Sequence, residues 1–333
     1  MKVIVSEDAV RSLIGSPDSY KVHLLLSFAI EGRHVILFEE QSALQDWIAL
    51  QDPALRASYS RTAEFNFRAA SIMASNASTI YIAGDNRVDW GDPISRVSID
   101  EALDVLREPL GVFVENADND WQFVVGLMRP AEREQVKEHL SKGWLVALHG
   151  GGATLPERIR DRASSPYRAL RTFAIFDSDR RHPLELESDW SPTGQEACQG
   201  FVVEQVASQC LASRYWRLER RFIESYMPIE EISATISGNI PREAPTAFSR
   251  MSIDEQWYFN MKKGFSGDSP IENTHRRRGL YADVSDGDKI ALRNGFGRKL
   301  ADRYSELANR EFNWDSAALR EASVAISNLM RLI

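Results

Sequence analysis

Short apolar runs alternate with amphipathic stretches along the first hundred residues. The runs Val3–Val5, His34–Phe38 and Thr79–Ala83 have the length and composition of buried strands. The stretch Val22–Ile30 and the segment that ends at Leu50 place apolar residues at helical spacing. Strands that alternate with helices indicate a parallel or mixed sheet, so the pattern predicts an N-terminal α/β portion.

One helix start is marked by its own sequence. Ser98 and Glu101 have the spacing of a capping box, in which the serine is the N-cap and the glutamate is the third helical residue. Leu103, Val105 and Leu106 follow as the apolar residues of the predicted helix.

A second series of strands and helices begins at Leu110. The apolar runs Leu110–Val114, Trp144–Leu148 and Thr172–Phe176 are predicted strands. Three helices are predicted around them, over Ala131–Lys142, Leu155–Arg162 and Gly194–Leu211. From Pro228 onward the pattern is mainly helical, with polar loops at 264–273 and 283–288 and a closing helix over Trp314–Leu332. We therefore divide the chain into an N-terminal α/β domain (1–108), a second α/β domain (109–228) and a mainly helical C-terminal region (229–333).

Composition excludes several classes of protein. The chain has 333 residues, 43% of them hydrophobic, and a net charge of −8, so it has no general attraction for nucleic acid and needs a local basic patch or bridging metal ions to bind it. Cys198 and Cys210 are too few for a disulfide framework or a zinc cluster, which favours a reduced, cytoplasmic location. The acidic start is unlike a signal peptide, and the apolar stretch Leu24–Ile30 is too short to span a bilayer. We expect no membrane association.

Acidic residues follow two of the predicted strands. Glu115 comes directly after Val114, and Asp177 and Asp179 come directly after Phe176. If both strands lie in one parallel sheet, these carboxylates meet at its carboxyl edge. Crowded carboxylates repel one another unless a cation lies between them, and oxygen ligands without Cys or His favour Mg²⁺ or Mn²⁺. The sequence predicts a site for one or two such ions.

The order of these motifs resembles the TOPRIM domain of topoisomerases, bacterial primases and several nucleases. In that family a Glu follows the first strand of a four-stranded parallel sheet and an Asp-x-Asp follows the third, where this chain has Glu115 and Asp177-Ser-Asp179. His149-Gly150-Gly151-Gly152 and the segment Leu218–Tyr226, with Glu224 as its second acid, are similar to motifs of the overcoming-lysogenization-defect (OLD) type nucleases. The resemblance covers about a third of the chain and implies a TOPRIM-like sheet flanked by helices.

The chain departs from the family pattern after the first strand. Asn116 replaces a Gly, and Asn119 stands where the second acid is expected, between Asp118 and Asp120. A loop longer by one residue would use Asp120, whereas the shorter loop would use Asp118. The ATPase that is fused to the nuclease in OLD proteins is absent, because no Gly-x-x-x-x-Gly-Lys-Ser/Thr motif occurs. Any ATPase or sensor would therefore be a separate partner.

Further residues are candidates for phosphate binding. The resemblance implies that Lys262 or Lys263 stabilises the phosphate in the transition state. We assign this role to Lys262 and expect Lys263 to bind nucleic acid. Arg276, Arg277 and Arg278 lie in a polar loop and are expected to contact a nucleic-acid backbone. Gly150, Gly151 and Gly152 would let phosphate approach the backbone closely, with His149 beside them.

These patterns predict a metal-dependent endonuclease. Asp177 and Asp179 would anchor one Mg²⁺ or Mn²⁺ ion, Glu115 would position a second and act as the general base, and Glu224 and Asp120 would complete the set of ligands. The resemblance extends the prediction to an antiviral effector that cuts DNA or RNA and is inhibited by a partner protein. The sequence leaves open whether the chain forms a homo-oligomer. The alternatives are a non-catalytic partner-binding module, which the departures at Asn116 and Asn119 favour, and a topoisomerase- or primase-type enzyme, for which the chain has little room.

Overall fold

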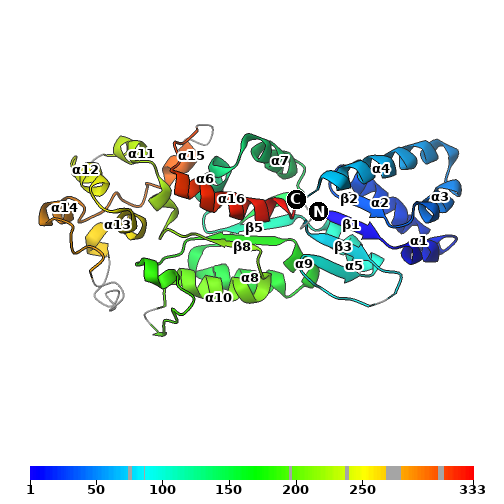
Figure 1. Cartoon of the computed structure of the whole chain (residues 1–333), viewed down its shortest axis with the longest axis horizontal. Coiled ribbons are helices and arrows are strands. Elements are labelled where there is room, and N and C mark those ends of the chain that lie inside the picture. The colour runs from blue at the N-terminus through cyan, green and yellow to red at the C-terminus, as the bar shows by residue number, and fades with distance from the viewer. Residues whose placement is uncertain (74–76, 86, 195–196, 237–239, 268–278, 307–310) are drawn as a thin grey trace.

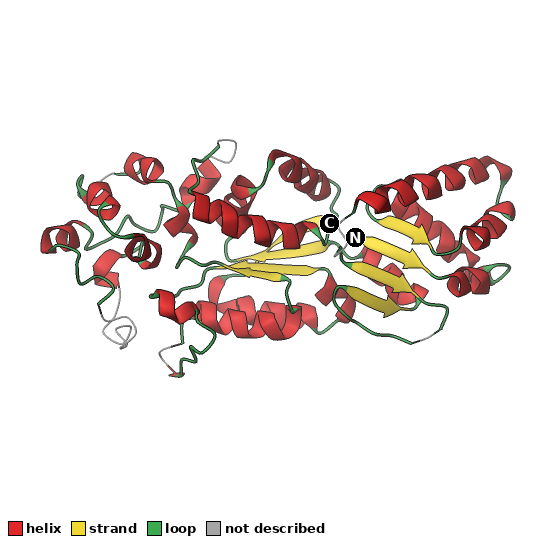
Figure 2. Ribbon diagram, viewed as in Figure 1, coloured by secondary structure: helices red, strands yellow, loops and turns green. Residues whose placement is uncertain are grey.

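The structure is a computed structural model that describes residues 1–73, 77–85, 87–194, 197–236, 240–267, 279–306 and 311–333. Two four-stranded sheets, each with all strands parallel and each flanked by helices, organise the chain into an α/β fold (Figure 1). The arrowheads of the two sheets point to opposite ends of the elongated molecule (Figure 2). The carboxyl edges of the sheets therefore face away from each other.

The N-terminal sheet has the strand order β2-β1-β3-β4. Its strands are β1 (Lys2–Val5), β2 (Val35–Phe38), β3 (Thr79–Ile82) and β4 (Ile94–Val97). The helices of this part are α1 (Glu7–Leu13), η1 (Pro17–Ser19), α2 (Tyr20–Ile30), α3 (Gln41–Ala49), α4 (Pro53–Ile72) and α5 (Ile99–Arg107). The capping box predicted at Ser98 and Glu101 is confirmed, because the side chains of both residues accept hydrogen bonds at the start of α5.

The second sheet has the order β6-β5-β7-β8. Its strands are β5 (Leu110–Val114), β6 (Leu145–His149), β7 (Thr172–Phe176) and β8 (Tyr215–Arg217). The helices around it are α6 (Asn119–Leu127), α7 (Pro130–Ser141), η2 (Gly152–Thr154), α8 (Leu155–Ala163), α9 (Pro166–Leu170), η3 (Pro183–Leu186), α10 (Gln199–Leu211) and η5 (Ile223–Tyr226).

The remaining helices are short until the last one. They are α11 (Ile229–Ala234), α12 (Ala244–Ser249), α13 (Ile253–Tyr258), η6 (Gly264–Gly267), α14 (Asp286–Ala291), α15 (Asp302–Glu306) and α16 (Ser316–Met330). Helices α11 to α14 form one end of the molecule, beyond the carboxyl edge of the second sheet, whereas α16 returns along that sheet (Figure 1).

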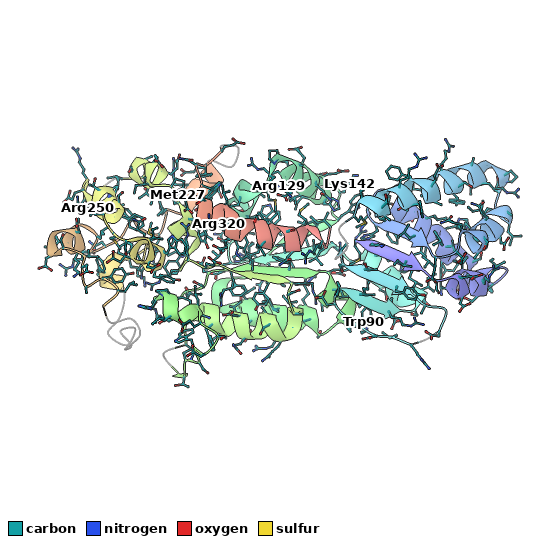
Figure 3. All side chains as sticks on the ribbon, viewed as in Figure 1. Trp90, Arg129, Lys142, Met227, Arg250 and Arg320 are labelled. Atoms are coloured by element: carbon teal, nitrogen blue, oxygen red, sulfur yellow. The ribbon has the colours of Figure 1, made fainter. Side chains whose placement is uncertain are left out.

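The central strands β5 and β7 are buried on both faces, which explains their continuous apolar sequences. Phe113 and Phe176 pack with α8 and α10 on one face, whereas Val112 and Ile175 belong to the core that includes α6 and α16 on the other. Side chains fill the space between sheet and helices throughout (Figure 3). This two-sided packing holds the ends of β5 and β7, where the acidic residues begin, in fixed positions.

The last helix is bound to the edge of the second sheet. Glu321 of α16 accepts hydrogen bonds from the Trp216 indole at 2.9 Å, from the Glu219 amide at 2.9 Å and from the Tyr226 hydroxyl at 2.7 Å. The chain then ends beside its start, where the amino group of Met1 donates to the Ile333 carbonyl oxygen. One hydrophobic core consequently joins residues of 110–232 with residues of 244–333.

Several predicted elements need correction. Strand β4 and the long helix α4 were not expected, and α10 begins at Gln199 rather than at residue 194. The polar segment 283–288 is not wholly a loop, because Ser285 caps α14 and the helix begins at Asp286. The other polar segment, 264–273, begins with the helical turn η6, and its later residues lie outside the described part. Among the helices of the described residues, none has both the length and the apolar sequence needed to cross a membrane.

Candidate functional site

A cavity of about 340 Å³ opens at the carboxyl edge of the second sheet, where the ends of neighbouring strands meet. Glu115 follows β5, Asp177 follows β7, and the segment after β8 supplies Glu224. We call this the acid cavity; the predicted site residues that line it are Glu115, Asp120, His149, Gly151, Gly152, Asp177, Glu224 and Lys262. The structure thus brings together residues that are up to about 150 positions apart in the sequence.

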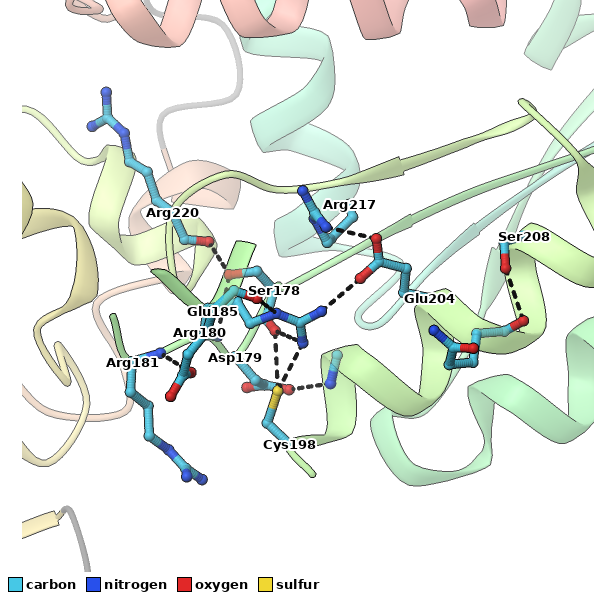
Figure 4. Close-up of polar contacts among 12 residues, drawn as sticks. Ser178, Asp179, Arg180, Arg181, Glu185, Cys198, Glu204, Ser208, Arg217 and Arg220 are labelled. Carbon is cyan, nitrogen blue, oxygen red and sulfur yellow. Dashed lines mark hydrogen bonds and ion pairs between the residues drawn. The ribbon is translucent and has the colours of Figure 1, made fainter. Parts of the chain in front are cut away.

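The Asp177–Asp179 turn directs its two acids to different sides. The Asp177 side chain is buried, and its Oδ1 accepts a hydrogen bond of 2.9 Å from the Ile223 amide. Asp179 has a φ of +53°, in the left-handed region that aspartate tolerates better than most residues. Its Oδ2 accepts a 2.9 Å hydrogen bond from the Gly200 amide at the start of α10 (Figure 4). Asp179 therefore lines a second cavity, next to the one lined by Asp177.

Gly200 allows α10 to approach this turn. A Cβ at this position would lie 2.2 Å from the Ser178 carbonyl oxygen and 2.5 Å from that of Asp177, and backbone atoms cannot move aside as a side chain can. We expect Gly200→Ala to destabilise the protein by about 1–3 kcal/mol through overpacking and to weaken binding of Mn²⁺. Urea unfolding and calorimetric titration with Mn²⁺ measure both effects.

The matched control is Gly287→Ala in α14, where a Cβ would have no neighbour closer than 3.9 Å. That change should be neutral or slightly stabilising, since alanine is the better helix former. Equal effects of the two substitutions would contradict the role given to Gly200.

Asp120, not Asp118, lies in the acid cavity. Its Oδ2 accepts a 2.8 Å hydrogen bond from the Asn116 amide, which holds the carboxylate next to the end of β5. Asp118 is exposed, and its own amide donates to Asn116 Oδ1 at 2.9 Å. Asn119, which stands where the resemblance leads one to expect the second acid, donates a 2.9 Å hydrogen bond to Asp302. The loop geometry thus chooses between the two candidates that the sequence left open.

Glu224 is 1% exposed, which rules out the alternative that it lies on a solvated face. Its Oε1 lies 3.3 Å from Lys262 Nζ, whereas its buried Oε2 has no hydrogen-bond partner in the described part of the chain. Lys262 Nζ also lies 3.9 Å from Asp177 Oδ2 and 4.5 Å from the centre of the Phe222 ring. One ammonium group thus stands among several carboxylates.

Five acidic side chains around the two cavities repel one another electrostatically. We call them the acid cluster: Glu115, Asp120, Asp177, Asp179 and Glu224. Burial, together with the smaller effect of repulsion by Asp179 and Asp120, raises the pKa of Glu115 to about 8, against the opposing charge of Lys262. Burial also raises the pKa of Asp120 to about 6. The pKa of Asp177 lies well above its ordinary value for the same reason, with Glu115 adding to it. Burial likewise raises the pKa values of Asp179 and Glu224.

The donor set suits a hard divalent cation. The acid cluster offers only carboxylate oxygens, the ligands that Mg²⁺ and Mn²⁺ prefer, and Glu224 Oε2 is a buried acceptor that receives no hydrogen bond from the described residues. A divalent cation would also stabilise the ionised carboxylates whose pKa values are now raised. Within the described residues, however, no three His, Cys, Asp or Glu side chains are arranged closely enough to hold an ion as they stand. The residues therefore have the right type of ligand atom for the ion, but the side chains must move closer together to coordinate it.

The glycine turn after β6 runs past Glu115. The Gly150 amide donates to the Val114 carbonyl oxygen at 2.6 Å, and the Gly151 amide donates to that of Glu115 at 3.2 Å. Gly151 and Gly152 have φ values of +69° and +49°, which favour glycine. His149, by contrast, is exposed at the end of the edge strand β6.

The predicted basic residues are only partly described. Lys263 is exposed and lines the second cavity, beside Lys262. Arg276, Arg277 and Arg278 lie outside the described residues. Two residues that the sequence analysis missed, Arg298 and Asp302, also line the acid cavity. Their sequence carries no motif that distinguishes them from ordinary surface residues, so only the fold reveals them.

Comparison with known proteins gives no assignment. No family model, no curated protein and no solved structure matches the chain. The function must therefore be argued from the site itself.

Proposed function

We propose that this protein is a divalent-metal-dependent endonuclease that hydrolyses phosphodiester bonds of DNA or RNA. The observation that carries the proposal is the acid cluster. Its members come from the ends of three neighbouring parallel strands and the loops after them, and burial and mutual repulsion raise their pKa values. Perturbed carboxylates collected in a cavity are a common mark of a functional site.

The resemblance supports the same reaction. A Glu after one central strand and an Asp-x-Asp after the other are the metal-binding residues of TOPRIM nucleases, and Glu115, Asp177 and Asp179 have these positions on β5 and β7. By the same resemblance, the protein would be an antiviral effector whose activity is controlled by a separate ATPase or sensor.

The roles of the residues follow from their positions. Asp177, Asp179 and Glu224 would hold the metal, with Asp120 completing the set. Glu115 would position a second ion and accept the proton of the attacking water, for which a pKa near neutrality is favourable. Lys262, which already lies 3.9 Å from Asp177, would neutralise the scissile phosphate. When bound, the divalent cations supply charge stabilisation on the attacking and leaving oxygens.

The test is cleavage of plasmid DNA and of total tRNA with Mg²⁺ or Mn²⁺, together with calorimetric titration of the same ions. We expect cutting of one substrate class that EDTA abolishes and that Asp177→Asn reduces together with metal binding. If the wild-type chain neither cuts these substrates nor binds the metal ions, the proposal is refuted.

A second candidate is a non-catalytic module that binds a partner protein. It is favoured by the present arrangement, in which Lys262 neutralises part of the acid cluster and no three ligands are ready for an ion in the described residues. Binding of Mn²⁺ to the wild-type chain, lost in Asp177→Asn, would favour the nuclease over this alternative.

A further inference from the structure

The acid cavity continues into a second cavity across the Asp177–Asp179 turn. The second cavity has a volume of about 300 Å³ and is lined by Asp179, Arg181, Gln199, Arg221, Asn260 and Lys263, among others. Lys262 lines both cavities, so they adjoin, and we call the two together the cleft. Four members of the acid cluster line the acid cavity and Asp179 lines the second, so the cluster contributes to both parts of the cleft.

Two loops of the C-terminal region form one wall of the cleft. Segments 260–267 and 292–299 are held together by hydrogen bonds of 2.8 Å, from the Phe296 amide to the Met261 carbonyl oxygen and from the Ser266 amide to that of Arg293. Gly264, with a φ of +62°, permits this approach, because a Cβ there would lie 2.1 Å from the Leu292 carbonyl oxygen. The two segments thus form one hydrogen-bonded unit.

This unit is strongly basic. Its two segments contain no Asp or Glu, and four of its cations, Lys263, Arg293, Arg298 and Lys299, are exposed. We call these four the cationic rim. None of the four takes part in an ion pair within the part of the chain that the structure describes. The neighbouring Arg250 and Arg303, in contrast, pair with Asp288 and Glu231. In a chain with a net charge of −8, cations that are grouped in this way and have no ion-pair partner among the described residues indicate an anionic ligand.

The rim contributes one side chain to each of the two cavities. Arg298 lines the acid cavity, whereas Lys263 lines the second cavity. We infer that the cationic rim binds backbone phosphates on both sides of the scissile phosphate, so that the substrate is a polynucleotide strand running through the cleft. The inference rests on the proposed function for the position of the scissile bond. It excludes a mononucleotide or a strand end as the preferred ligand, because these would leave one part of the rim unused.

The experiment measures binding rather than cleavage. Fluorescence anisotropy follows binding of the full chain, in Ca²⁺ and in EDTA, to labelled DNA and RNA strands of about 20 nucleotides, longer than the sites of about 4–16 nucleotides typical of single-strand-binding domains. The variants are Arg298→Gln with Lys299→Gln, and Lys263→Gln with Arg293→Gln. Each pair should weaken binding about tenfold and reduce the salt slope of log K by about 1–2, because phosphate contacts are lost. The matched control, Arg56→Gln with Arg61→Gln on α4, removes two exposed cations far from the cleft and should change neither.

The outcomes separate the inference from the proposed function. Unchanged affinity and salt slope in both rim variants would overturn the inference, even if the chain cleaves nucleic acid. Absence of binding by the wild-type chain would overturn it as well, and so would equally tight binding of a dinucleotide. Rim-dependent binding by a chain that does not cleave would support the inference and count against the nuclease.

Discussion

Replacing Glu115 with glutamine is expected to stabilise the metal-free protein above about pH 8 and to reduce metal-dependent cleavage at least about 100-fold. The pKa of Glu115 is about 8 in the folded protein, chiefly because of burial, against an ordinary value of 4.5. The folded state holds this proton more tightly than the unfolded state does. The stabilisation that this bound proton gives the folded state is therefore complete below pH 4.5 and is lost as the pH rises to about 8. Glutamine cannot ionise, so the variant avoids this loss of stability. The size of the pKa shift corresponds to roughly 3–5 kcal/mol in the free energy of unfolding.

The measurement is urea unfolding in EDTA at about pH 5 and about pH 8.5, on either side of most of this titration. The wild-type chain should lose stability between the two values, and Glu115→Gln should lose less. Burial lowers the pKa values of His34 and His139, so these groups change the stability with pH in the opposite direction. They contribute equally to both proteins and cancel in the difference. Glu157→Gln, at an exposed position of α8, is the control and should behave as the wild type.

Addition of Mn²⁺ at the higher pH extends the test. The ion should restore the stability of the wild-type chain more than that of Glu115→Gln, since the variant lacks one carboxylate. Cleavage should fall at least about 100-fold, given that even residues that only support metal ligands commonly contribute 10–100-fold. An identical loss of stability with pH in both proteins would show that Glu115 does not carry the raised pKa.

The strand ends that carry the acids were predictable, because a strand buried on both faces has a continuous apolar sequence. Strands β5 and β7 are continuous apolar runs, and a parallel sheet necessarily brings their carboxyl ends together. Glu115 and Asp177 could therefore be placed at one edge before the fold was known. Helix α4 gives no such signal, because Phe65, Phe67 and Ile72 are exposed and interrupt the spacing expected of an amphipathic helix.

The cavity walls could not be predicted, since they depend on contacts between distant segments. Asp302 comes to the site through a hydrogen bond to Asn119, 183 residues away, and no local pattern encodes such a contact. The choice of Asp120 over Asp118 similarly depended on one backbone hydrogen bond from Asn116. The helical period of α16 predicts a helix but not its partner, so its attachment to β8 through Glu321 was also hidden.

Replacing Lys262 with methionine is expected to reduce cleavage about 10²–10³-fold while leaving Mn²⁺ binding intact or tighter. Burial alone would lower the pKa of Lys262, but Asp177, Glu224 and Glu115 together raise it above its ordinary value. The ammonium group therefore stays charged at neutral pH and occupies space among the carboxylates that a metal would use. Its removal takes away both a competitor of the metal and the cation that we propose neutralises the substrate phosphate.

The same substitution should destabilise the metal-free protein, with the opposite sign to Glu115→Gln. A raised lysine pKa stabilises the folded state at every pH below the ordinary value of 10.5, so the loss should appear throughout the neutral range. Urea unfolding in EDTA, calorimetric titration with Mn²⁺ and the cleavage assay measure the three effects. The control is Lys137→Met, which breaks an exposed pair with Glu134 on α7 and should change little. Metal affinity lost together with cleavage would instead make Lys262 a support of the acid cluster, because a residue that acts on the phosphate alone leaves metal binding unharmed.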